Sequence, residues 1–183
     1  YVLQRRQGAA MFGVYGESSN VTLMDVTAYS GPSVFVGSTN SRQINLIDTH
    51  VAIRPDDWVH TADTQRWKSI NADGVHIQNS RVGAWIEDST FEGIGDDVMN
   101  FYTLPMTILN QSGPREVTLA AMTSGRLYSS YETAIQVGDH LAFFDPIEGK
   151  ILKTARVIEV STLTVPSPKD GEQLYDARLV KFD

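Results

Sequence analysis

The sequence contains no cysteine, which narrows the chemistry that the protein can carry out. Disulfides, cysteine nucleophiles and cysteine-ligated metal sites are all excluded. Apolar runs are also short, well below the ~18 residues that a membrane-spanning helix needs. The sequence therefore predicts neither thiol chemistry nor a membrane partner.

Basic residues are outnumbered as well, with 15 Lys and Arg against 22 Asp and Glu, for a net charge of −7. A negative surface disfavours binding to nucleic acid and, mildly, to a polyanionic substrate. The histidines at positions 50, 60 and 140 lack metal-ligand spacing, and no calcium-loop motif is present. We therefore expect no required metal and no other cofactor.

Short alternating apolar segments recur along the first half of the chain. Three copies share one pattern: VTLMDVTAY (21–29), INLIDTHVA (44–52) and AWIEDSTFE (84–92). Their central acids, Asp25, Asp48 and Asp88, are 23 and then 40 residues apart, as if a loop were inserted into one repeat. Period-two alternation on both sides of each acid predicts a strand, a polar bend and a second strand.

A second, valine-rich pattern repeats at a similar interval. Its copies are MFGVYG, SVFVGS, GVHIQNS and DVMNFY, and 23 residues separate Phe12 from Phe35 and Val75 from Val98. Short strands at a fixed spacing, with few helical signals, predict an all-β solenoid, specifically a right-handed parallel β-helix. A β-sandwich also contains short strands but is not expected to keep one register in two patterns.

The pattern changes after Pro105. The segments REVTLAAM, GDHLAFFDP, KILKTARVIEV and LYDARLVKFD predict antiparallel strands joined by turns such as DPIEGK and SPKDGEQ. We expect β-helix coils over residues 1–105 and a small antiparallel β-barrel or meander over residues 106–183. Because solenoid coils need neighbours or caps, the abrupt start at Tyr1 predicts a fragment of a longer chain.

Three acids stand out within the segment 71–102, NADGVHIQNSRVGAWIEDSTFEGIGDDVMNFY. Asp73 and Asp96 are 23 residues apart, and Asp97 follows directly. If Asp73 and Asp96 are equivalent positions on consecutive coils, they lie ~4.8 Å apart at the backbone. We therefore expect three carboxyl groups to share one solvent-facing patch.

Clustered like charges cost free energy, which favours a chemical role over a structural one. Glycoside hydrolysis uses one protonated carboxyl group as general acid and an ionised one as base or nucleophile. The structural alternative is that aspartates cap turns at the starts of strands, as we expect for Asp25, Asp48 and Asp88. The combination of Asp73, Asp96 and Asp97 favours function.

These segments resemble known β-helical glycoside hydrolases. Polygalacturonases pair an Asn-Thr-Asp-Gly segment with Gly-Asp-Asp one coil later. The segment 71–102 more closely resembles glycoside hydrolase family 110, the exo-acting α-1,3-galactosidases, whose β-helix carries small β-barrel insertions. The polygalacturonase Gly-His-Gly and Arg-Ile-Lys segments, and the cysteine after the Asp pair, are absent.

The resemblance implies an inverting exo-glycoside hydrolase that releases terminal α-linked galactose from a galactose-containing oligosaccharide or glycan. By the same resemblance, Asp96 is the general acid, Asp73 and Asp97 position and activate water, and the protein is secreted or periplasmic in a bacterium. Two alternatives stay open. One is a hydrolase or lyase of another polysaccharide, although an all-acid cluster disfavours a lyase. The other is a non-catalytic carbohydrate-binding β-helix.

Four further residues are candidates for substrate binding. Trp58, in the loop RPDDWVHTADTQRWK, has a ring that can stack on a sugar, as has Trp67, or cover the solenoid. Arg54 binds sugar hydroxyls or pairs with nearby acids. His76 points opposite to Val75 and Ile77 and so faces outward near Asp73. Asn100 orients the carboxylates or joins an asparagine stack.

Overall fold

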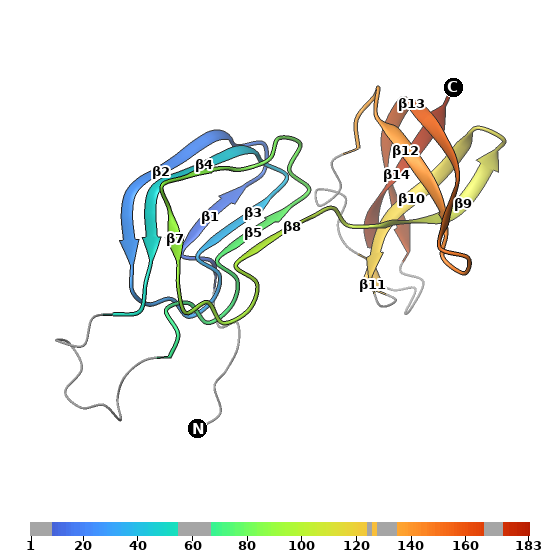
Figure 1. The fold of residues 1–183 in the computed structure, drawn as a ribbon. Coiled ribbons are helices and arrows are strands. Elements are labelled where there is room, and N and C mark those ends of the chain that lie inside the picture. The colour runs from blue at the N-terminus through green and yellow to red at the C-terminus, as the bar shows by residue number, and fades with distance from the viewer. Residues whose placement is uncertain (1–8, 55–66, 124–125, 128–134, 167–173) are drawn as a thin grey trace. The chain divides into compact units, whose positions relative to one another are not determined.

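The computed structural model describes residues 9–54, 67–123, 126–127, 135–166 and 174–183 (Figure 1). The chain divides into an N-terminal unit, Tyr1–Thr103, and a C-terminal unit, Leu104–Asp183. The described residues form strands and no helix, so the fold is all-β as predicted. None of these residues belongs to a helix that could cross a membrane.

The N-terminal unit consists of two parallel sheets. The first sheet has the order β1-β3-β5-β8, with bounds Phe12–Tyr15, Val36–Thr39, Val75–Gln78 and Met99–Tyr102. The second sheet has the order β2-β4-β6, with β7 also on β4; the bounds are Ser19–Ala28, Arg42–Val51, Trp85–Glu87 and Thr90–Phe91. The chain passes from one sheet to the other and back, and we call each such pass a winding.

The predicted register is confirmed in the second sheet. Leu23 pairs with Leu46, and Leu46 pairs with Ile86, so the offsets are 23 and 40 residues. The acids at the centres of these repeats, Asp25, Asp48 and Asp88, have φ angles of 54°, 49° and 48°. Asp tolerates this left-handed conformation better than most residues. The repeated polar position is therefore the bend that the sequence predicts.

The predicted register is wrong by one residue in the first sheet. Val75 pairs with Met99, not Val98, and Phe12 pairs with Val36, not Phe35. Both offsets are 24 residues. In the first winding the extra residue lies in the turn after Tyr15, which is one residue longer than the turn after the equivalent residue, Thr39. Because the turn after Thr39 is shorter, the offset between β2 and β4 in the second sheet is 23 residues.

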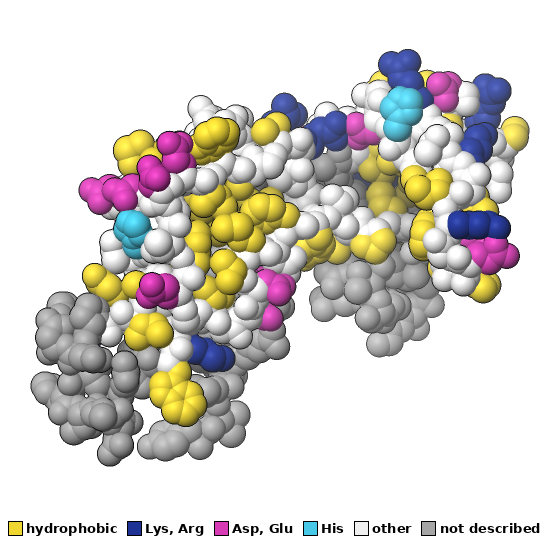
Figure 2. All heavy atoms as spheres, in the orientation of Figure 1, with side chains coloured by type: hydrophobic (Ala, Val, Ile, Leu, Met, Phe, Trp, Pro, Cys, Tyr) yellow, Lys and Arg dark blue, Asp and Glu magenta, His cyan; other side chains and the backbone are white. Residues whose placement is uncertain are grey.

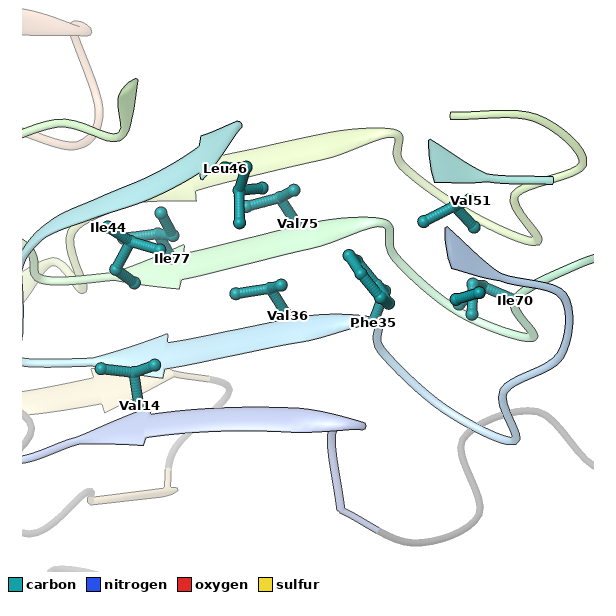
Figure 3. Packing of buried hydrophobic residues seen from close by; sticks show 10 residues of the cluster. Val14, Phe35, Val36, Ile44, Leu46, Val51, Ile70, Val75 and Ile77 are labelled. Carbon is teal, nitrogen blue, oxygen red and sulfur yellow. The ribbon is translucent and has the colours of Figure 1, made fainter. Parts of the chain in front are cut away.

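The core of the N-terminal unit lies between the two sheets (Figure 3). Its side chains come from the strands and from the turns that precede β3 and β5, and those labelled in Figure 3 are Val14, Phe35, Val36, Ile44, Leu46, Val51, Ile70, Val75 and Ile77. The Phe35 ring is fully buried and meets the rings of Phe12 and Phe91 edge-on, at centroid distances of 5.4 and 6.4 Å. Burying one such ring contributes about 1.5–3 kcal/mol.

The last strand of the first sheet leaves its inward side chains uncovered. Met99 and Phe101 are 45% and 49% exposed, whereas their partners in β5, Val75 and Ile77, are 0% and 4% exposed. Each winding thus buries the side chains of the winding before it. Figure 2 shows hydrophobic side chains gathered on this unit.

The C-terminal unit is an antiparallel sheet curved into a half-barrel (Figure 1). Its order is β11-β10-β14-β13-β12, with β9 on β10; the bounds are Met106–Gly113 (β9), Glu116–Thr123 (β10), Arg126–Leu127 (β11), His140–Asp145 (β12), Lys150–Pro166 (β13) and Leu174–Phe182 (β14). The predicted antiparallel strands are therefore present. Lys181 Nζ donates to Glu159 at 2.9 Å, and this hydrogen bond raises the pKa of Lys181.

Candidate functional site

The predicted acids lie in two turns of equivalent position, one before β5 and one before β8. Ile70 and Ile94 form a parallel bridge where the two turns begin. Where they end, Gly74 donates its amide proton to the Asp97 carbonyl at 2.9 Å, and Val75 donates to the Val98 carbonyl at 2.9 Å. Backbone hydrogen bonds therefore hold consecutive windings together at the acids.

This pairing changes which acids are level with each other. The 24-residue offset places Asp97 beside Asp73, whereas Asp96 is level with Ala72. The prediction that Asp73 and Asp96 are equivalent positions is therefore wrong. Equivalent positions on neighbouring strands are ~4.8 Å apart at the backbone, so Asp73 and Asp97 are the stacked pair, and Asp96 adjoins it.

Close approach of the backbones explains a glycine in the second turn. A Cβ atom at Gly95 would lie 2.6 Å from the carbonyl oxygen of Asn71, in the turn of the preceding winding. A backbone carbonyl cannot move aside to make room for a Cβ atom, whereas the end of a flexible side chain can. Gly95 therefore allows the Asp96 and Asp97 turn to stack directly on the Asp73 turn.

The carboxyl group of Asp73 is buried, contrary to the prediction that all three acids face solvent. Its side chain is 0% exposed, and His76 Nδ1 lies 2.5 Å from Oδ2. Asn100 Nδ2, on the neighbouring strand, is 3.5 Å from the same oxygen. Burying a carboxylate is costly unless polar partners compensate it, and His76 and Asn100 supply that compensation.

The hydrogen bonds continue from His76 across to β8. His76 Nε2 is 3.2 Å from the Tyr102 hydroxyl, and the two rings meet edge-on with centroids 5.3 Å apart. The Tyr102 hydroxyl in turn lies 3.1 Å from Gln78 Oε1. A chain of polar contacts thus runs from buried Asp73 to the surface of the first sheet.

Asp96 and Asp97 differ from Asp73 in exposure. Asp97 is exposed, and Asp96 is partly buried. The two accessible carboxyl groups can provide a general acid and a general base. The buried carboxyl group, which is bonded to a histidine, can orient the neighbouring imidazole and amide groups.

Outward side chains of the first sheet form two rows that cross all four strands. One row contains Gly13, Gly37, His76 and Asn100, and the other contains Tyr15, Thr39, Gln78 and Tyr102. The alternation in β5 is as predicted, because Val75 and Ile77 are buried while His76 points outward. With histidine neutral, none of these eight side chains is charged. We call this surface the outer face of the first sheet.

The predicted binding residues differ in what the structure describes of them. Trp58 lies outside the described residues. Arg54 is partly buried and Trp67 is 88% exposed. Asn100 and His76 do contact Asp73. Tyr102 was not among the predicted residues, although a 24-residue register places it opposite Gln78.

A separate concavity of about 210 Å³ lies in the C-terminal unit. Its lining includes Arg115, Lys153, Phe182 and a single carboxylate, Asp183. This composition lacks a carboxyl pair. Within the described ranges, no group of three or more histidine and acidic side chains could hold a metal ion.

Comparison with known proteins does not identify this chain. No family model matches it, and no curated protein matches it significantly. Its own residues and their geometry therefore carry the functional interpretation.

Proposed function

We propose that the N-terminal unit is a right-handed parallel β-helix that carries the active site of an inverting exo-glycoside hydrolase of the family 110 type. Its substrate is an oligosaccharide or glycan that ends in α-linked galactose. We also propose that the protein is secreted or periplasmic, because such glycans occur there.

The stacking of Asp97 beside Asp73, with Asp96 adjoining, is the observation that carries this proposal. In the proposed reaction, Asp96 protonates the departing glycosidic oxygen as general acid. Asp97, the most exposed of the three acids, accepts a proton from the attacking water. Water enters from the side opposite the leaving group, so the configuration at the anomeric carbon inverts.

Asp73 takes a supporting part in this scheme. Its buried carboxylate is bonded to His76 and Asn100, which leaves it poorly placed to reach the sugar directly. We assign it the positioning of His76, whose ring lies on the outer face of the first sheet. His76 and Asn100 then bind hydroxyl groups of the galactose.

The character of the outer face favours a galactoside over a pectin. A polyuronate carries a carboxylate on each sugar, and its recognition calls for lysine or arginine. The eight outward positions of the first sheet hold glycine, threonine, tyrosine, histidine, glutamine and asparagine instead. A neutral sugar fits this surface better.

Substitution of the acids tests the proposal. Hydrolysis of an aryl α-galactoside and of polygalacturonate is measured for the wild type and for Asp96→Asn and Asp97→Asn. We expect galactoside hydrolysis alone, reduced by at least about a hundredfold in each variant, the usual size of a general acid or base contribution. Wild-type rates in both variants, with the fold intact, would overturn the proposed site.

A second candidate function is non-catalytic carbohydrate binding. Burial of Asp73 favours it, because a carboxylate sealed at 0% exposure serves a structural network without touching substrate. In that case the sugar binds but is never cleaved, and the two acid substitutions change its affinity alone.

A further inference from the structure

Tyr15 lies over Gly13 on the outer face of the first sheet, and its hydroxyl borders Gly37. A Cβ atom at Gly13 would be 2.4 Å from Tyr15 Cε2, whereas a Cβ atom at Gly37 would be 2.9 Å from the Ala10 side chain and 3.7 Å from the Tyr15 hydroxyl. The ring therefore folds back over its own strand and extends toward β3. Side chains at positions 13 and 37 would occupy the space that the ring fills or borders.

More than half of the Tyr15 side chain remains exposed to solvent. Tyr15 is 56% exposed, although the ring rests on Gly13. A large aromatic ring held against backbone loses little conformational entropy on binding, and its apolar face suits the C–H face of a pyranose. Tyr15 thus offers a flat, preorganised platform rather than a mobile side chain.

The surroundings of Tyr15 indicate what chemistry this platform would bind. On β3 the neighbouring outward positions are Gly37 and Thr39, and on β5 they are His76 and Gln78. These residues offer hydroxyl, imidazole and amide groups but no formal charge with histidine neutral. A neutral sugar, with an apolar face and hydroxyl edges, matches them better than an anionic or purely apolar ligand.

The position of Tyr15 separates it from the acids. β1 lies two strands from β5, so at ~4.8 Å per strand the platform is about 10 Å from the strand of His76. We propose that Tyr15 stacks on the third sugar ring of the substrate, two beyond the galactose held by His76 and Asn100. This inference rests on the proposed function and makes the enzyme selective for oligosaccharides over simple galactosides.

A structural role for Tyr15 predicts different behaviour. Aromatic rings over glycines also shield the backbone of edge strands, and β1 is at one end of its sheet. Loss of such a shield would lower stability without changing the relative affinities for short and long sugars. Affinity for sugars of two lengths, measured together with the melting temperature, separates the two roles.

The test uses calorimetric titration of the full chain with galactose and with a sulfur-linked, non-hydrolysable trisaccharide that ends in α-galactose. Four variants are compared with the wild type: Tyr15→Ala, Tyr15→Phe, Gly13→Ala and Trp85→Ala. Gly13→Ala keeps the ring but displaces it. Trp85→Ala removes an aromatic side chain of similar exposure, 60%, from the second sheet.

We expect Tyr15→Ala and Gly13→Ala each to weaken trisaccharide binding about tenfold, in the range of an aromatic contact at an interface. Tyr15→Phe and Trp85→Ala should stay within about twofold of the wild type, and galactose affinity should not change in any variant.

Unchanged trisaccharide binding in Tyr15→Ala, or an equal loss for galactose and trisaccharide, would overturn the inference, as would a wild type that binds neither sugar. A wild type that binds the trisaccharide through Tyr15 but cleaves no galactoside would sustain this subsite while removing the proposed hydrolase.

Discussion

Asp73 and Asp97 occupy equivalent positions on neighbouring windings, and the amide of Gly74 donates to the carbonyl of Asp97 at 2.9 Å. The two acids nevertheless have opposite environments. Asp73 is sealed and bonded to His76, whereas Asp97 is exposed to solvent. A single turn geometry, repeated one winding later, thus produces one structural and one accessible carboxyl group.

This contrast predicts that the two acids respond differently to substitution. Asp73→Ala leaves His76 Nδ1 and Asn100 Nδ2 without their buried acceptor, so we expect a loss of about 2–4 kcal/mol in the free energy of unfolding. Asp97→Asn, at an exposed position, should change it by less than about 0.5 kcal/mol while abolishing hydrolysis. Urea unfolding and galactoside hydrolysis measure the two effects. Equal destabilisation by both variants would contradict the assigned environments.

Tyr102 is expected to act through His76 rather than on the sugar. Tyr102→Phe keeps the edge-on ring contact but removes the hydroxyl that links His76 to Gln78, at an expected cost of about 0.5–1.5 kcal/mol. The variant should also raise the KM for the galactoside, because His76 loses a partner for Nε2 and its ring is held less firmly.

Gln78→Ala supplies the control for Tyr102→Phe, since it removes only the far end of the chain of contacts. A KM equal to that of the wild type in Tyr102→Phe, despite the same drop in stability, would leave Tyr102 with a packing role alone.

Gly95→Ala should disturb both the fold and the site. The added methyl group would lie 2.6 Å from the Asn71 carbonyl oxygen, so the Asp96 turn must move away from the preceding winding. We expect destabilisation of about 1–3 kcal/mol and a matching loss of hydrolysis. Gly83→Ala is the matched control, because nothing lies within 4 Å of its Cβ position. Thermal unfolding of the pair checks this, and similar melting temperatures would refute the close approach.

The exposed apolar side chains on the last strand of the first sheet predict that the protein self-associates. Phe101 and Met99 point inward but remain about half exposed on the last strand. Exposed apolar patches promote association, so Phe101→Gln should reduce self-association and the binding of a hydrophobic dye. The matching change in the preceding winding, Ile77→Gln, buries a polar group and should unfold the unit. Sedimentation velocity that is unchanged by Phe101→Gln would show that this end is covered in solution.

The sequence predicted the strands of the N-terminal unit better than their register. Alternating residues around Asp25, Asp48 and Asp88 were sufficient to align the second sheet, because the bend fixes each strand on both sides. Matching like residues failed in the first sheet. Val75 resembles Val98 but pairs with Met99, since turn length and inward alternation, not residue identity, determine register.

The relative placement of the three acids was predicted in part for the same reason. Three acids on consecutive windings follow from the repeat spacing, but the partner of Asp73 depended on a single residue in a turn. Burial of Asp73 was also not predictable, because it depends on His76 and Asn100 folding over the carboxylate. The contact of Tyr102 with Gln78 could be predicted only with the 24-residue register, which pairs these two residues.

The anomer of the sugar first released is the most direct measure of the central claim. Proton NMR during hydrolysis of an α-galactoside by the full chain distinguishes the two product configurations before they interconvert. We predict that β-galactose forms first, and that Asp96→Asn releases none. Initial release of α-galactose, or release at an unchanged rate by Asp96→Asn, would contradict an inverting reaction at these acids.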